Sequence, residues 1–169
     1  IYTVLRAAER LLHEARIRFV FFGAGKDVSR IQEEARTKKL ANVIFAGVSP
    51  KKDMPAVVAS ADVCLAILQN IAMFRTTYPN KVFDYMAAGR PTVLVIDGVI
   101  REVIEASNGG VFVPPGDDEL LARTILALSK DPQRVQQLAR NARDYLVKHL
   151  NRRDKMDETL RFFQTLVRA

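Results

Sequence analysis

The chain is poor in the residues that build disulfide frameworks and metal clusters, since its 169 residues include one cysteine and two histidines. A single cysteine, Cys64, excludes a disulfide within the chain and is typical of a reducing compartment such as the cytoplasm. The apolar run DVCLAIL around it contains no base to activate a thiol, so we interpret Cys64 as a buried core residue. His13 and His149 are far apart and belong to no metal-type cluster, so we expect no metal and no cofactor.

Long apolar runs are also missing. No stretch approaches the roughly 20 residues of a membrane span, and no signal peptide begins the chain. We therefore expect a cytoplasmic protein, with any membrane contact peripheral, at the inner membrane face. The first residue is Ile1, and an amphipathic helical pattern begins at once. From this we expect a piece excised from a longer protein.

Basic residues exceed acidic ones, and the formal net charge of +7 is unevenly placed. Residues 130–169 contain ten Lys and Arg against five Asp and Glu, a balance of +5. Solvated helix faces, an anionic membrane surface and nucleic acid all remain open as explanations. Tyr145, Phe162 and Phe163 lie among the basic residues at helical core spacing. We therefore favour solvated faces, then membrane attraction, and expect no nucleic-acid partner.

Apolar strand patterns alternate with helical patterns along the whole chain. The segments FVFF, NVIFAG, DVCLAIL, TVLV and GGVFV read as buried strands. Helical periodicity predicts helices over 1–15, 27–39, 50–61, 81–88, 99–107, 117–130, 132–150 and 152–169. Nearly continuous apolar strands separated by helices indicate an α/β fold, a Rossmann-like parallel sheet with helices on both faces. We expect one domain over residues 1–169, with extra helices at its carboxyl end.

A ligand site in such a sheet lies at the carboxyl ends of the strands. This directs attention to the loops after Phe22, Phe45, Leu68, Ile96 and Val113. The first of these loops contains Gly23-Ala24-Gly25, but Val28 stands where a dinucleotide fingerprint has its third glycine. These glycines indicate no more than a tight turn in which the backbone approaches a ligand.

The loop over residues 69–79 is long for an α/β connection, which is typical of functional loops. It leads into a helix that Gly89 and Pro91 end. A helix N-terminus attracts phosphate, and flanking cations would neutralise a diphosphate. The diphosphate and sugar candidates are Arg75, Thr76, Thr77, Tyr78, Asn80 and Lys81. The structural alternative is that Asn80 caps the helix, Lys81 pairs with Asp84, and nothing binds. The residues alone leave both interpretations open.

A resemblance to a known family bears on the choice between these two interpretations. The segments FVFFGAG, NVIFAGVSPKKDMPAVVASADVCL, NKVFDYMAAGRPTV and REVIEASNGGVFVPPGDDELLARTILAL resemble, in the same order, the carboxyl-terminal half of retaining GT-B-fold glycosyltransferases. The resemblance is to the group 1, family four type, and covers Phe19 to about Leu150. It implies a domain that binds a nucleotide-sugar donor, with an acceptor domain that precedes residue 1 in the same protein.

The resemblance also implies roles for single residues. The acid ahead of Met-Ala-x-Gly binds the ribose hydroxyls, which maps to Asp84. The turn that flanks the base maps to Phe45, Gly47 and Val48, and the glycine turn to Gly23 and Gly25. The diphosphate and sugar map to Arg75 through Lys81, and the family needs no metal. Its upstream Arg and Lys, which grip the diphosphate, would precede Ile1.

Two positions depart from the family pattern. Thr76 stands where many members have a Glu that touches the donor sugar, and Asp84 replaces the usual Glu. These departures indicate a different donor sugar or a different loop. From the resemblance as a whole we expect a glycosyltransferase of hexosyltransferase type that acts on a lipid-linked or polysaccharide acceptor. The alternatives are a sugar-nucleotide epimerase of the same fold and a non-catalytic nucleotide- or nucleic-acid-binding module.

Overall fold

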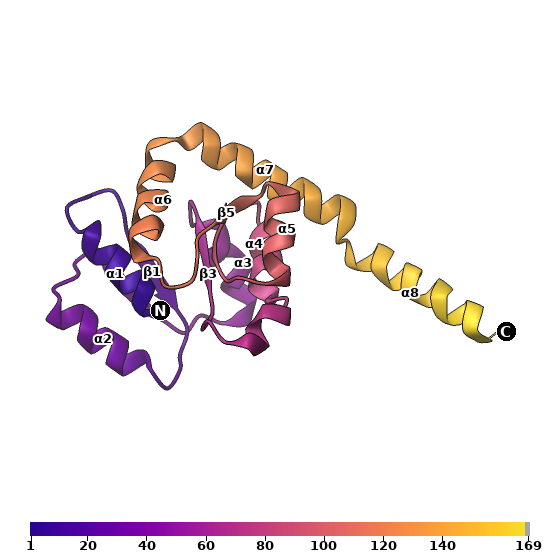
Figure 1. Ribbon diagram of the computed structural model, residues 1–169, viewed down its shortest axis with the longest axis horizontal. Coiled ribbons are helices and arrows are strands. Elements are labelled where there is room, and N and C mark those ends of the chain that lie inside the picture. The colour runs from indigo at the N-terminus through magenta and orange to yellow at the C-terminus, as the bar shows by residue number, and fades with distance from the viewer. Residues whose placement is uncertain (168–169) are drawn as a thin grey trace.

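The computed structural model describes residues 1–167 as alternating helices and short strands (Figure 1). The strands are β1 (Phe19–Phe22), β2 (Val43–Gly47), β3 (Cys64–Ile67), β4 (Thr92–Val95) and β5 (Gly110–Phe112). The helices are α1 (Tyr2–Arg10), α2 (Val28–Thr37), α3 (Met54–Ala59), α4 (Asn80–Ala87), α5 (Val99–Ser107), α6 (Asp118–Lys130), α7 (Pro132–His149) and α8 (Arg152–Val167). Two 3₁₀ turns, η1 (Lys51–Asp53) and η2 (Ala72–Thr76), complete the order. The last two residues of the predicted terminal helix, 168–169, lie outside the described residues.

All strand pairs are parallel, which confirms the α/β fold class. β1 pairs with β2, and β3, β4 and β5 form a second sheet in that order. Within residues 1–167 no strand pairing joins β1 to β3. The strands therefore form two sheets, where the sequence predicted one.

β4 shows why helices cover both faces. All four of its residues are buried, and the last three alternate between two apolar clusters. Val93 and Val95 pack with residues of α1 and α6. Leu94 packs on the opposite face with residues of α4, α5 and α7. A strand buried on both faces can carry apolar residues at successive positions, as Val93, Leu94 and Val95 do.

Charged contacts hold α1 against α6. Asp118 in the first turn of α6 accepts hydrogen bonds from Arg6 Nε at 2.8 Å and from Arg10 Nε at 2.7 Å. These two hydrogen bonds lower the pKa of the Asp118 carboxyl below its ordinary value. The two arginines of α1 precede Asp118 by more than 100 residues in the sequence. Their contact with Asp118 therefore links the first helix to a distant part of the chain.

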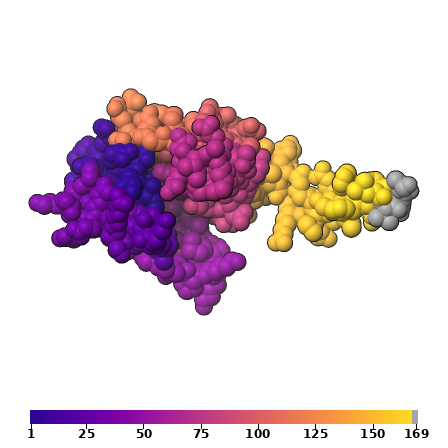
Figure 2. Space-filling view, turned by 60° about the horizontal axis from the view of Figure 1, so that its bottom comes forward, coloured from indigo at the N-terminus to yellow at the C-terminus, as the bar shows by residue number. Residues whose placement is uncertain are grey.

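α8 projects away from the rest of the molecule (Figure 2). Every residue from 152 to 166 is exposed. Tyr145 of α7 packs against the core as its spacing predicted. The same prediction is wrong for Phe162 and Phe163, which are 61% and 56% exposed because no element covers α8 among the described residues.

Candidate functional site

The loops at the carboxyl ends of the strands enclose two cavities. Those after β1 and β2 line a cavity of about 320 Å³. Those after β3 and β5, with Val95 of β4, line a second cavity of about 370 Å³. Ile1, directly before α1, lines both cavities. These are the loops in which a parallel sheet is expected to place a ligand.

The first cavity brings together residues that the sequence predicted from separate segments. Gly23, Gly25, Phe45 and Gly47 all line it. Val48, predicted with them, is 71% exposed and is not part of the lining. The first cavity thus unites four of the five predicted residues from the loops after β1 and β2.

An aromatic pair belongs to the lining of the first cavity. The rings of Phe21 and Phe45 stack with centroids 5.3 Å apart and an angle of 17° between their planes. In the same lining, Gly23 N–H donates to the Gly47 carbonyl at 2.7 Å, and both glycines have positive φ. A Cβ at either glycine would meet open space, so no neighbouring atom covers the backbone there. Aromatic side chains together with uncovered peptide groups suit a planar heterocycle.

The long loop after β3 has more order than the sequence indicated. It was predicted to be irregular, but Ala72–Thr76 forms the 3₁₀ turn η2. The hydroxyls of Thr76 and Thr77 donate to the Met73 carbonyl at 3.3 and 3.2 Å, so they hold the loop itself. Gln69 and Asn70 line the second cavity, whereas the predicted residues from Arg75 to Lys81 line neither.

Gly98, which the sequence analysis did not single out, supports this loop. It precedes α5 with φ +141°, and a Cβ there would lie 2.6 and 2.7 Å from the Arg75 Cα and carbonyl carbon. Only glycine allows the backbone of η2 to approach so closely. A glycine between a strand and a helix, as in IDGVI, is the sequence signal that would have marked this contact.

α4 lacks both contacts of the structural alternative. Pro79 is its N-cap, Asn80 is its first helical residue, and no side chain caps it. No salt bridge joins Lys81 to Asp84 among residues 1–167, and both residues are exposed. The first N–H groups of α4 and the Asp84 carboxylate are therefore open to a ligand, although Tyr78 and its neighbours line neither of the two cavities.

Burial shifts the pKa of two titratable side chains near the core, Cys64 and Tyr85. Burial raises the pKa of the Cys64 thiol to about 11, which keeps it protonated and unreactive at neutral pH. Burial also raises the pKa of Tyr85 to about 12. These values agree with Cys64 as a core residue.

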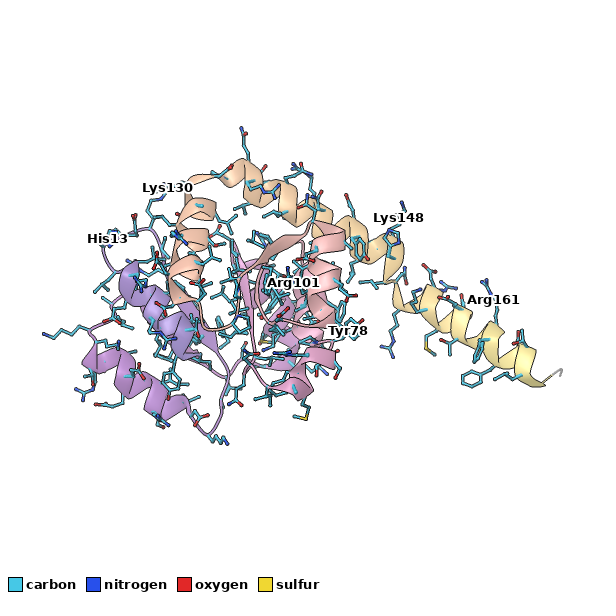
Figure 3. The ribbon with its side chains drawn as sticks, viewed as in Figure 1. His13, Tyr78, Arg101, Lys130, Lys148 and Arg161 are labelled. Carbon is cyan, nitrogen blue, oxygen red and sulfur yellow. The ribbon has the colours of Figure 1, made fainter. Side chains whose placement is uncertain are left out.

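The two histidines lie far apart in the structure. His13 lies at the opposite end of the domain from Lys148, the neighbour of His149 (Figure 3). Across residues 1–167 no group of three or more His, Cys, Asp or Glu is placed to hold a metal ion. The expectation that no cofactor is needed stays a prediction. In the same residues no helix is both long and apolar enough to cross a membrane.

Comparison with known proteins gives a consistent result. A family model described as "Glycosyl transferases group 1" matches residues 1–131. A search of curated protein sequences finds no match. Solved structures do match, and those described below are each under 25% identical to this chain, so they support the fold.

Three of these structures illustrate the likeness. Anabaena HepE in complex with UDP superposes with a TM-score of 0.80 at 19% identity, over 94% of this chain and 44% of its own. The C-terminal domain of the Francisella tularensis group 1 glycosyl transferase LpcC gives 0.73 at 17% identity, over 88% of this chain and 77% of its own. WaaG, a glycosyltransferase involved in lipopolysaccharide biosynthesis, gives 0.71 at 19% identity, over 85% of this chain and 38% of its own. The chain spans less than half the length of HepE and WaaG.

Proposed function

The chain belongs to the glycosyl transferases group 1 family and has the fold of a carboxyl-terminal GT-B domain, and we propose that it binds the nucleotide-sugar donor of a retaining glycosyltransferase. The observation that carries the proposal is the first cavity, where Gly23, Gly25, Phe45 and Gly47 meet at the carboxyl ends of parallel strands. HepE, which has this fold, was solved with UDP and with UDP-glucose. We assign the base of the nucleotide to this cavity.

We expect the rest of the nucleotide to extend toward α4, because of the direction in which the strands run. Helices α2 and α4 each follow a strand, so their N-termini lie at the same carboxyl edge as the two cavities. The open N–H groups of α4, with Arg75 and Lys81 beside them, would stabilise negative charge on the departing diphosphate. Asp84, one turn along the helix, would accept hydrogen bonds from the ribose hydroxyls. The second cavity, with Gln69 and Asn70, is left for the sugar.

The wider activity rests on the family resemblance and on the relatives. We propose a hexosyl transfer that needs no metal, to a lipid-linked or polysaccharide acceptor, in the cytoplasm or at the inner membrane face. The role of WaaG in lipopolysaccharide biosynthesis supports that class of acceptor. An acceptor domain before residue 1 would supply the other wall of the site, and residues 1–169 would form one donor domain.

A thermal-shift panel tests donor binding. The protein is heated with UDP-, GDP-, ADP- and TDP-sugars, with inorganic diphosphate as the control anion. A ligand at 100 times its Kd stabilises the folded state by about 2.7 kcal/mol, so a true donor should raise the melting temperature clearly. One nucleotide-sugar should exceed the rest, with little salt dependence. No response to any of them, or binding to nucleic acid with a steep salt slope, would reject the proposal.

A further inference from the structure

Three polar side chains that have no role in the site described so far line the first cavity. They belong to Lys26, Asp27 and Gln32, and all three residues are exposed. Val28 N–H donates to the Gly25 carbonyl at 3.2 Å, so Lys26 and Asp27 are the two central residues of the turn between β1 and α2. The turn therefore brings an ammonium and a carboxylate to the cavity at adjacent positions.

The Asp27 carboxylate does not cap its own helix. Asp27 is the N-cap residue of α2, a position at which an aspartate usually accepts a hydrogen bond from the first helical turn. Asp117 and Asp131 do so at the starts of α6 and α7. Asp27 instead has φ −98° and ψ 0°, and its side chain makes no such bond. Neither Asp27 nor Lys26 forms a salt bridge within residues 1–167, so both charged groups are available to a ligand.

A carboxylate in the lining restricts which part of a nucleotide the cavity accepts. Like charges repel, so Asp27 disfavours the diphosphate. A carboxylate only accepts hydrogen bonds, so it requires N–H or O–H groups on the ligand. The stacked rings of Phe21 and Phe45 in the same lining suit a planar base. The base of the nucleotide, rather than its phosphates, is therefore the part that suits Asp27.

The bases differ in the hydrogen-bonding groups that they offer to an ammonium beside a carboxylate. Guanine carries two neighbouring donors, N1–H and the N2 amino group, next to the acceptor O6. Two N–H bonds to one carboxylate and an ammonium on O6 satisfy this whole edge. Uracil and thymine carry one N–H between two carbonyl oxygens, and these oxygens would repel the carboxylate. Adenine and cytosine have a ring nitrogen acceptor beside the amino group, which opposes the carboxylate in the same way.

We propose that Lys26 and Asp27 select a guanine base, so that the donor is a GDP-sugar. Asp27 would accept hydrogen bonds from N1–H and the N2 amino group, and Lys26 would donate to O6. Gln32 does not discriminate, because its amide both donates and accepts and so suits any base. The inference rests on the proposed donor function and adds the identity of the base to it.

Titration calorimetry of the protein with the diphosphates of guanosine, inosine, uridine and adenosine (GDP, IDP, UDP and ADP) tests this selection. IDP is GDP without the N2 amino group, so it keeps O6 and N1–H but offers one donor fewer. IDP should therefore bind about tenfold more weakly than GDP, and UDP and ADP should bind more weakly still. In Asp27→Asn the affinity for GDP should fall about ten- to a hundredfold and approach that for IDP, with little effect on UDP.

Two further variants complete the test. Asp62 is exposed, lines neither cavity and precedes β3 at its amino end, so Asp62→Asn changes the net charge equally outside the site. This control should bind all four nucleotides as the wild type does. Lys26→Gln should weaken GDP and IDP by the same factor, because both carry O6, and should weaken UDP less.

The outcomes separate this inference from the donor function. UDP or ADP that binds as tightly as GDP, or an unchanged ratio of GDP to IDP affinity in Asp27→Asn, overturns the guanine assignment and leaves a nucleotide site in place. An equal loss for all four nucleotides in Lys26→Gln assigns Lys26 to the diphosphate and overturns its part in the selection. If a protein that melts cooperatively binds none of the four, the donor function is overturned as well.

Discussion

Asp84 is exposed in the first half of α4 and has no ion-pair partner among residues 1–167. If it accepts hydrogen bonds from ribose hydroxyls, these are charge-assisted bonds worth roughly 1.5–3 kcal/mol. Asp84→Asn should therefore weaken binding of the best nucleotide-sugar about ten- to a hundredfold, as measured by titration calorimetry. The melting temperature of the free domain should hardly change, because the folded state loses no contact.

Asp144→Asn on α7 is the matched control for charge. Asp144 is also exposed and lines neither cavity, so its loss changes the net charge equally at a position outside the proposed site. It should leave the affinity unchanged. If Asp84→Asn binds the nucleotide as tightly as the Asp144 variant does, the ribose assignment is wrong.

Gly98 tests whether the position of η2 matters for binding. Gly98→Ala would combine unfavourable backbone at φ +141° with a clash against Arg75. The strain alone costs about 1–3 kcal/mol, and relief of the clash requires η2 to move. We expect a lower melting temperature and, where Arg75 contacts the diphosphate, weaker donor binding.

Gly89→Ala separates strain from clash. Gly89 has φ +62° and lines neither cavity, and a Cβ there would make only an ordinary contact with Arg143 Cδ at 3.8 Å. This variant should lose stability to a similar degree while keeping a larger part of the donor affinity. Equal affinities for the two variants would show that displacement of η2 has no effect on the site.

At the scale of elements, Asp118 links α1 to α6 and makes stability depend on pH. Its pKa is lowered in the folded state by hydrogen bonds from Arg6 and Arg10. Such a group stabilises the fold above its unfolded pKa of about 3.9, and the stabilisation is lost as the pH falls through the lowered folded value. Asp118→Asn should lower the melting temperature at pH 7, and the difference from the wild type should shrink at pH 3.

Glu119→Gln is the control for this contact, because Glu119 lies in the same first turn and meets the same helix dipole. Its one ion pair within residues 1–167, with Arg123 at 3.9 Å, lies on the surface and contributes little. A loss of stability at pH 7 as large as that of Asp118→Asn would assign the effect to the helix dipole.

α8 offers a separate test of the basic carboxyl end. Its exposed apolar residues Met156, Leu160 and Phe163 recur at helical spacing, beside Arg153 and Arg161. Each cation near an anionic surface contributes on the order of 1 kcal/mol. Vesicle co-sedimentation should therefore rise with the content of anionic lipid and fall with salt. Equal binding to neutral vesicles would reject an electrostatic contribution.

Local signals in the sequence were sufficient for most elements. The Gly-Arg-Pro stop predicted the end of α4, and there Gly89 adopts φ +62° while Arg90 N–H donates to the Tyr85 carbonyl. Asp131 caps α7 through Arg134 N–H and Pro132 is the first helical residue, a combination of residue types that favours a helix start. The order in η2 was not predicted, because its close approach to Gly98 joins segments more than 20 residues apart, and the glycine before α5 is the one local sign of that contact. The exposure of Phe162 likewise depends on which partner α8 has, and helical periodicity carries no information on partners.

At the scale of the whole molecule, the predicted site falls into two parts for a physical reason. Strand order brings the glycine loop and Phe45 together, so a rule about parallel sheets was enough to predict the first cavity. Arg75 through Lys81 line neither cavity. The rule predicts only that the start of the loop after β3, at Gln69 and Asn70, lies beside a cavity, and it does not position residues farther along that loop.

This division leads to a prediction about activity. The 169-residue chain should bind its nucleotide-sugar but transfer no sugar, because group transfer requires an acceptor beside the donor and a site closed to water. We expect labelled sugar to enter a lipid or polysaccharide fraction only with the full-length protein. Nucleotide binding by the short chain, measured in the same buffer, is the control that its donor site has formed. Transfer by the short chain alone would contradict the prediction and show that residues 1–169 contain both the donor and the acceptor site.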